Sequence, residues 1–330
     1  MTIDDRRGIA IAFRTERGTG VGESTPLPGW TEAYERTEQI LQTMGNESID
    51  PWARPLPNDA PAARHGIHLA VTDLAATVTE LPLATYLRGR DVPTTVPVNA
   101  TVGIGSVAWT LQQVSDAIDV GFDTVKVKIG GDQVSDTIAR IEALESVTET
   151  VDIRLDANRR WNHNEARNVI QAAANAGVSL IEEPLDNPTP DRLTALQHTD
   201  VEIALDETMA GQFHDDTDGW LDAVDAVVLK PMVLGGVDRT IDLATRAREA
   251  DVVPIISNTV DGVIARAAAV HVAAALQCET AAGLATGSML GEDLAADIVP
   301  VSDGEIRVPT TPGIGTLGPW DRTATGASEP

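Results

Sequence analysis

Lysine is rare in this acidic chain, and its three lysines all lie at the ends of apolar runs. Among 24 basic residues, only Lys126, Lys128 and Lys230 are lysine. Lys126 and Lys128 are two positions apart in the run 124–129, so in a β-strand both side chains point to one side of the sheet. A partly desolvated amine near other cations has its neutral form favoured and can accept a proton at neutral pH. The lysines are therefore candidate acid–base groups. Their scarcity disfavours the alternative, ordinary charges on a solvated strand.

Acidic residues end the three apolar runs between Lys128 and Lys230. These acids are Asp156, Glu182 and Asp206, and the successive intervals from Lys128 to Lys230 are 28, 26, 24 and 24 residues. Because one strand-and-helix unit of a barrel has about that length, the five side chains are expected to meet at one barrel mouth. Three converging carboxylates repel one another unless a cation pairs with them, and hard oxygen ligands suit Mg²⁺ or Mn²⁺. Each acid alone is equally well explained as one of 50 on the surface, but their joint spacing favours a metal site.

The runs that carry these residues belong to a series of eight, separated by stretches of helical length. Short apolar runs predict strands, and the intervening stretches rich in Ala, Gln, Glu and Arg predict helices. The eight runs are 96–102, 124–129, 151–156, 179–183, 201–206, 226–230, 252–257 and 279–284. Eight consecutive units predict an α/β fold of the (β/α)8 TIM-type barrel class, whose active site lies at the carboxyl ends of the strands.

The rest of the chain predicts a smaller α+β N-terminal capping domain. Residues 1–92 contain a hairpin-like pattern followed by two helical stretches, 32–44 and 60–78. The tail 300–330 contains a strand and turns, and we expect it to pack back on this domain. The barrel, as the catalytic domain, is then 93–299.

Composition bounds the partners of the protein. Fifty acidic residues against 24 basic ones give a formal net charge of -26, which excludes nucleic acid as a partner. Such charge destabilises a compact state unless salt screens it, so we expect a cytoplasmic protein of a halophilic organism. An ordinary acidic surface is the alternative. Cys278 is the only cysteine, so neither a disulfide nor a cysteine metal site forms within one chain. No apolar stretch has the length of a membrane span, and the oligomeric state stays open.

Five motifs, in order along the chain, resemble one family. They are Val-Lys-Val-Lys at 125–128, Leu-Asp-Ala-Asn at 155–158, Ile-Glu-Glu-Pro at 181–184, Leu-Asp-Glu at 205–207 and Val-Leu-Lys-Pro at 228–231. Together they resemble the muconate-lactonizing subgroup of the enolase superfamily over nearly the whole chain. Within that subgroup, the segment Val-Gly-Glu-Ser-Thr-Pro-Leu-Pro-Gly-Trp at 21–30 and Arg154 resemble the o-succinylbenzoate synthases of menaquinone biosynthesis.

The resemblance implies a hydro-lyase acting on a small-molecule carboxylate. A proton alpha to the carboxylate of 2-succinyl-6-hydroxy-2,4-cyclohexadiene-1-carboxylate is removed with metal assistance, and syn loss of hydroxide gives 2-succinylbenzoate. Lys128 would take the proton and deliver it to the departing hydroxide, while Lys230 would stabilise the enediolate from the opposite face. Lys126 would keep Lys128 basic by like-charge repulsion.

The resemblance also implies roles for other side chains near the mouth. Asp156, Glu182 and Asp206 would hold Mg²⁺, with Mn²⁺ as the alternative ion. Further candidates either support these ligands or touch substrate, and each has the alternative role of a strand-end cap: Arg154, Asn158, Glu207, Ser257 and Asn258.

Three alternatives remain within the same superfamily. The same lysines can serve an N-acylamino-acid racemase, a dipeptide epimerase or a muconate cycloisomerase. A truncated, non-catalytic binding protein is a further alternative, which the retained lysines disfavour. Members of the resembled family begin with another strand and a mobile loop ahead of the segment that starts here at Asp4. Either the start was assigned too late, or the mouth is covered differently, and lid loops matter because they exclude water.

Overall fold

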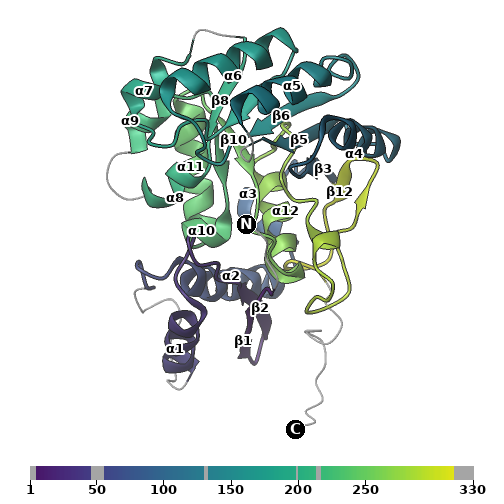
Figure 1. The fold of residues 1–330 in the computed structure, drawn as a ribbon. Coiled ribbons are helices and arrows are strands. Elements are labelled where there is room, and N and C mark those ends of the chain that lie inside the picture. Colours follow the sequence, from purple (N-terminus) through teal and green to yellow (C-terminus); the bar gives the residue numbers. More distant parts are fainter. Residues whose placement is uncertain (1–4, 46–55, 130–132, 198–199, 213–216, 316–330) are drawn as a thin grey trace.

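In the computed structural model a parallel sheet forms the wall of a barrel (Figure 1). The structure describes residues 5–45, 56–129, 133–197, 200–212 and 217–315. Seven parallel strands follow one another in chain order around the barrel. They are β4 (Ala100–Val102), β5 (Thr124–Lys128), β6 (Asp152–Asp156), β7 (Leu180–Glu182), β8 (Glu202–Leu205), β9 (Ala226–Leu229) and β10 (Val253–Ile256). Each matches one predicted run, so the α/β barrel class is confirmed.

The eighth predicted strand, 279–284, is not a strand in the structure. Ala282 forms an isolated bridge with Val98, and Gly283 forms another with Ser257, so this segment closes the barrel between the first and seventh strands. A Cβ at Gly283 would lie 2.5 Å from Oγ of Ser257, so glycine permits this close approach. Alanine and glycine have weak strand preferences, which explains why single bridges replace a ladder.

The first predicted run is divided between two sheets. It contains β3 (Thr95–Pro97) as well as β4, and β3 pairs with the tail strand β12 (Glu305–Arg307) instead of joining the barrel sheet. β12 also forms a short hairpin with β11 (Val301–Ser302). This antiparallel sheet of three strands attaches the tail to the start of the barrel.

Helices cover the outside of the barrel. The longer ones are α4 (Val107–Asp119), α5 (Val134–Leu144), α6 (His163–Asn175), α11 (Val237–Glu249) and α12 (Val263–Ala275). In the described residues, four short helices also lie between successive barrel strands, and a 3-10 turn follows the closing segment: α7 (Pro190–Thr194), α8 (Glu207–Gln212), α9 (Thr217–Leu221), α10 (Pro231–Leu234) and η1 (Gly287–Met289). α6 begins with a capping box between Asn162 and Glu165, which satisfies two backbone N–H groups that a helix start leaves open.

Strand alternation places the charged side chains inside the barrel. On β5, Val125 and Val127 are fully buried, so Lys126 and Lys128 between and after them point into the interior, as predicted. A small apolar cluster fills the middle of the barrel and consists of Leu180, Ala204, Ala226, Val228 and Ile255. Two positions further along four of these strands, and so nearer their carboxyl ends on the same face, stand the polar residues Glu182, Asp206, Lys230 and Ser257. The barrel thus has an apolar floor and a polar mouth.

The described residues of the capping segment form a hairpin and three helices. β1 (Ile9–Thr15) pairs antiparallel with β2 (Gly18–Ser24), followed by α1 (Tyr34–Gly45), α2 (Pro61–Val78) and α3 (Leu83–Arg88). β2 packs directly on α2, and the backbones are so close that a Cβ at Gly20 would lie 2.1 Å from the carbonyl oxygen of Ala70. Only glycine fits at this position. Figure 1 shows this segment at one end of the barrel, with α2 beside α10. The cap therefore covers the carboxyl ends of the strands.

The tail returns to the cap as expected from the sequence. Gly313 exchanges backbone hydrogen bonds with Leu81 and Leu83, and the N–H of Ile314 donates to Oδ1 of Asp73 at 2.8 Å. The domain limits at 92 and 300 stay predictions, and their outermost parts, 1–4 with Asp4, 46–55 and 316–330, lie outside the described residues. No helix among the described residues has both the length and the apolar character needed to cross a membrane.

The charge of the chain leads to a prediction about stability in salt. We expect the melting temperature to rise by about 10 °C between 0.1 M and 2 M KCl, because repulsion within a molecule of net charge -26 is screened. Differential scanning calorimetry measures this, with sucrose of equal osmolarity as the uncharged control. A melting temperature that is constant or falls in molar KCl contradicts the halophile hypothesis.

Candidate active site

The two lysines of β5 contact the carboxylates of the neighbouring strands. Nζ of Lys126 donates to Oε2 of Glu182 at 2.9 Å and lies 3.7 Å from Oδ2 of Asp156. Nζ of Lys128 lies 3.1 Å from the same Oδ2 atom of Asp156. Parallel register places Lys128 directly beside Asp156 and Asp156 directly beside Glu182. The predicted convergence of these four side chains is present.

Lys230 and Asp206 form a second ion pair on the following strands. Nζ of Lys230 lies 2.6 Å from Oδ2 of Asp206, and both side chains are nearly buried. The ring of Trp30, from the cap, lies over this ammonium group with Nζ 3.7 Å from the ring centroid. An aromatic face attracts a cation at this distance. The cap loop, residues 25–33 between β2 and α1, thus reaches the barrel mouth at Lys230.

The charges in the mouth act on one another. Burial raises the pKa of Glu182 most, and the charges of Asp156 and Asp206 raise it further. Lys126 lowers this pKa in part, and the result is a pKa of about 7. Burial also opposes the charged form of Asp156, but Lys126 and Lys128 outweigh it and hold the pKa of Asp156 below its usual value. For Lys126, the attraction of Glu182 and Asp156 overcomes burial and raises the pKa. The three carboxylates are therefore close enough to repel one another.

The donor set of the mouth fits a divalent cation, although no ligand cage is preformed. Among the described residues, no three His, Cys, Asp or Glu side chains stand in a ready metal-binding arrangement, because the carboxylates turn toward lysines. Oδ1 of Asp206 is nevertheless buried without a hydrogen-bond partner in the described part of the chain. A buried carboxylate oxygen left in this state is costly, and a cation would satisfy it.

Asn158 and Glu207 continue the polar network from Lys128. Nζ of Lys128 donates to Oδ1 of Asn158 at 3.1 Å, and Nδ2 of Asn158 donates to Oε1 of Glu207 at 2.9 Å. Burial and the neighbouring Asp206 raise the pKa of Glu207 to about 7. Both residues lie at the mouth, as predicted.

Arg154 lies elsewhere. Its guanidinium donates to the carbonyl oxygen of Ala281 at 2.8 Å and to Oδ2 of Asp152 at 3.3 Å. Asp152 begins β6, so the side chain of Arg154 turns toward the amino ends of the strands, opposite the mouth. This position fits a role in closing the barrel, and it gives no support to the predicted substrate contact.

Ser257 and Asn258 follow β10 and hold the closing segment. Oγ of Ser257 donates to the carbonyl oxygen of Gly283 at 3.2 Å, and Nδ2 of Asn258 donates to Oγ1 of Thr286 at 2.9 Å. Oδ1 of Asn258 accepts from the N–H of Val260 at 3.1 Å. These contacts position the loop beyond the seventh strand, and the predicted substrate contact of both residues stays a prediction.

Arg6 holds the cap loop in place and was not among the residues expected at the site. Its guanidinium donates to the carbonyl oxygens of Pro26 and Thr25, each at 2.9 Å, and to that of Val260 at 3.1 Å. It also pairs with Asp261 at 3.2 Å. These partners belong to the cap loop and to the segment after β10, so one side chain ties the cap to the barrel. No local motif marks such a contact, because its partners are up to 255 residues away.

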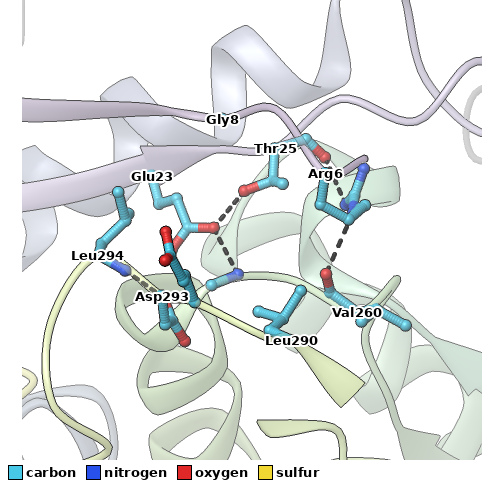
Figure 2. A pocket seen from close by; sticks show the side chains of 10 residues that line it. Arg6, Gly8, Glu23, Thr25, Val260, Leu290, Asp293 and Leu294 are labelled. Atoms are coloured by element: carbon cyan, nitrogen blue, oxygen red, sulfur yellow. Dashed lines mark hydrogen bonds between the residues drawn. The ribbon is translucent and has the colours of Figure 1, made fainter. Parts of the chain in front are cut away.

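Glu23 makes a second connection between cap and barrel. Its carboxylate accepts from the N–H groups of Gly262 at 2.7 Å and Ala265 at 3.0 Å, at the start of α12, and from the hydroxyl of Thr25. Figure 2 shows Glu23 beside Asp293 in a small cavity between the cap and the barrel loops. Burial, then the charge of Asp261, raise the pKa of Glu23 from 4.5 to about 7.

This shift predicts how stability depends on pH. Between pH 4.5 and 7 the folded protein holds a proton on Glu23 that the unfolded chain releases, so this contribution falls as pH rises through the window. It amounts to on the order of 3 kcal/mol. We expect Glu23→Gln to remove that slope, measured by urea unfolding at pH 5 to 7.5. Glu292→Gln is the matched control, since Glu292 lines the same cavity but is exposed. If the free energy of unfolding depends on pH with the same slope in wild type and in Glu23→Gln, the prediction is wrong.

Fold and mouth together define a barrel enzyme of the enolase type. The family profile described as enolase C-terminal domain-like matches residues 109–317, which is more than half of the chain. The chain therefore belongs to the enolase superfamily.

Curated relatives of different activities share similar identity with the chain. The hydrophobic dipeptide epimerase of Enterococcus faecalis is 32% identical over 56% of this chain and 55% of its own length. The o-succinylbenzoate synthase of Mycobacterium leprae is 32% identical over 66% and 64%. The chloromuconate cycloisomerase of Pseudomonas putida is 29% identical over 90% and 85%. For the first two relatives, the alignment spans less than two thirds of their length.

Solved structures agree with the barrel-and-cap architecture. Muconate cycloisomerase from Pseudomonas fluorescens has a TM-score of 0.84 at 22% identity, covering 97% of this chain and 95% of the other. A dipeptide epimerase from Methylococcus capsulatus, complexed with a Mg ion, has a TM-score of 0.80 at 26% identity, covering 93% of each chain.

Proposed function

We propose that the protein is an o-succinylbenzoate synthase, a hydro-lyase that dehydrates 2-succinyl-6-hydroxy-2,4-cyclohexadiene-1-carboxylate. The proton on the carbon bearing the carboxylate passes to an amine, and the C–OH bond at the neighbouring carbon breaks. Hydroxide leaves with that proton as water. The two ring electrons left behind complete the aromatic ring of 2-succinylbenzoate, so no oxidant is needed.

The observation that carries this proposal is that lysines contact the carboxylate cluster from two opposite sides. Lys126 and Lys128 contact Glu182 and Asp156 on one side, and Lys230 contacts Asp206 on the other. A carboxylate substrate held between them has an amine on either face of its α-carbon. Lys128 is the more accessible of the β5 lysines, with 38% of its side chain exposed against 12% for Lys126, which suits it to receive the proton.

The other two lysines then have electrostatic roles. Lys230, nearly buried under Trp30, provides a fixed positive charge on the face opposite Lys128, where negative charge develops on the enediolate. Lys126 stays bound to Glu182 and keeps positive charge beside Lys128.

Mg²⁺ is the proposed cofactor, held by Asp156, Glu182 and Asp206. The relative from Methylococcus capsulatus was solved with a Mg ion, and the unsatisfied Oδ1 of Asp206 supports a cation at this position. When bound, the ion supplies Lewis-acid stabilisation of the substrate carboxylate as its α-carbon loses the proton.

Neutral side chains on the far side of the mouth support a dianionic substrate over a dipeptide. Ser257 and Asn258 follow the seventh strand, Thr286 follows the closing segment, and all three are buried, uncharged hydrogen-bonding residues. The free ammonium group of a dipeptide needs a carboxylate partner when it is buried. Because Ser257 donates to Gly283 and one N–H of Asn258 donates to Thr286, a second carboxylate, as in the succinyl group, would be served by the other N–H of Asn258 and by the hydroxyl of Thr286.

A racemase or epimerase is the second candidate function. The same opposed lysines favour it, because racemisation needs a proton donor on each face of the α-carbon, and the Enterococcus faecalis relative is a dipeptide epimerase. Incubation with the cyclohexadiene precursor and Mg²⁺, followed by detection of 2-succinylbenzoate, tests the first candidate. Epimerised dipeptides or racemised N-acylamino acids without any 2-succinylbenzoate would replace it with the second.

A further inference from the structure

Three side chains from separate barrel units form one hydrogen-bonded chain at the mouth. Lys128 ends β5, Asn158 follows β6 and Glu207 begins α8 after β8. Nζ of Lys128 donates to Oδ1 of Asn158 at 3.1 Å, and Nδ2 of Asn158 donates to Oε1 of Glu207 at 2.9 Å. Asn158 therefore connects the amine of Lys128 to a carboxylate that does not contact it.

The two ends of this chain fix the orientation of the Asn158 amide. An ammonium group only donates and an ionised carboxylate only accepts, so with both groups charged the amide turns its oxygen to Lys128 and its NH₂ to Glu207. The backbone of Asn158 is held as well. Its φ is +45°, a left-handed conformation that asparagine tolerates, and its N–H donates to Oδ1 of Asp156 at 3.1 Å.

Lys128 needs such a support more than the other lysines do. Its side chain is 38% exposed, against 12% for Lys126 and 9% for Lys230. Among the described residues, its other polar contact is Asp156, a proposed cation ligand, whereas Asn158 is neutral and stays available to the amine. A neutral acceptor directs Nζ without placing a second negative charge beside it.

We propose that Asn158 is a positioning residue that directs the amine of Lys128 toward the substrate, and that Glu207 acts through Asn158 by orienting its amide. This inference rests on the proposed role of Lys128 in proton transfer.

Kinetics of the Mg²⁺-loaded enzyme test this positioning of Lys128 by Asn158 and Glu207, called the relay below. We expect Asn158→Ala and Glu207→Ala each to lower kcat about 30-fold with KM nearly unchanged, because a misdirected amine slows proton transfer. The double variant should be no slower than either single one, since both act on the same contact. Glu207→Gln keeps a carbonyl acceptor for Asn158 and should retain most activity. Asn168→Ala, on the exposed face of α6, is the control and should match wild type.

A second readout does not depend on turnover. The chain has only three lysines, so trace acetylation of the metal-free protein followed by peptide mass spectrometry reports each site amine. We expect acetylation of Lys128 to rise several-fold in Asn158→Ala and Glu207→Ala but not in Glu207→Gln, with Lys230 as the internal reference.

The outcomes separate this inference from the proposed function. Additive losses in the double variant, or unchanged Lys128 acetylation in both alanine variants, overturn the relay. If Lys128→Ala abolishes turnover while Asn158→Ala is as active as wild type, only the relay fails. If Lys128→Ala itself stays active, the proposed function fails first.

Discussion

Lys128→Ala is expected to lower turnover of the cyclohexadiene precursor by on the order of 10⁴-fold while the protein stays folded. The amine is the proposed acceptor of the α-proton, and no other described lysine replaces it on that face. Lys126 is bound to Glu182, and Lys230 stands on the opposite side with Asp206. The side chain of Lys128 is 38% exposed, so its removal leaves the buried core unchanged. Product formation under saturating substrate measures the loss, and circular dichroism with thermal melting checks the fold.

A second substitution separates basicity from charge. Lys128→Arg retains a cation beside Asp156, but a guanidinium group does not release its proton near neutral pH. We expect it to be as inactive as the alanine variant. Arg167→Ala removes an exposed cation from α6 and should match wild type. Turnover within tenfold of wild type in Lys128→Ala would falsify the acid–base assignment, and activity in Lys128→Arg alone would reduce the residue to an electrostatic role.

Removal of divalent metal is expected to abolish turnover, with a loss of at least about 10³-fold that added Mg²⁺ reverses. Burial and, after it, the charges of Asp156 and Asp206 raise the pKa of Glu182, so a cation placed beside this carboxylate favours its ionised form. An ion at this position also binds the folded state alone. At 100 times its dissociation constant it adds about 2.7 kcal/mol of stability, which is a rise in melting temperature of about 4 °C.

The control must exclude nonspecific binding of Mg²⁺ to so acidic a protein. We therefore place the melting experiment in 2 M KCl, where surface charges are screened. Asp206→Asn should lose the Mg²⁺-dependent rise, while Asp242→Asn, an exposed acid of α11, should keep it. Full activity after exhaustive chelation, or an equal rise in Asp206→Asn, would remove the metal from the proposal.

Much of the candidate site was predictable because a barrel repeats. Each strand-and-helix unit returns the chain to the same end of the sheet, so regularly spaced polar residues after apolar runs must converge. The repeat predicts one shared mouth for Lys128, Asp156, Glu182, Asp206 and Lys230, and the structure places them there. The alternation of side chains in a strand likewise predicted that Lys126 and Lys128 share the inner face.

Other features depended on contacts between distant segments. The run 279–284 looks like a strand by its position in the series, but it closes the barrel by two bridges, because small residues there let the backbones approach closely. Arg154 shares the inner face with Asp156, yet its guanidinium turns to Asp152 and Ala281. A repeat pattern gives the face of a residue but not the direction of a long side chain.

By itself, the sequence determined the class of fold and the residues of the mouth, since both follow from periodicity within each unit and from the rarity of lysine. Only the tertiary structure decided how the cap meets the barrel. The contacts of Arg6 with Val260, of Glu23 with Gly262 and of Trp30 with Lys230 join residues about 200 or more positions apart. These residues meet because β2 packs on α2 and α2 lies beside α10, so no local sequence pattern predicts the contacts.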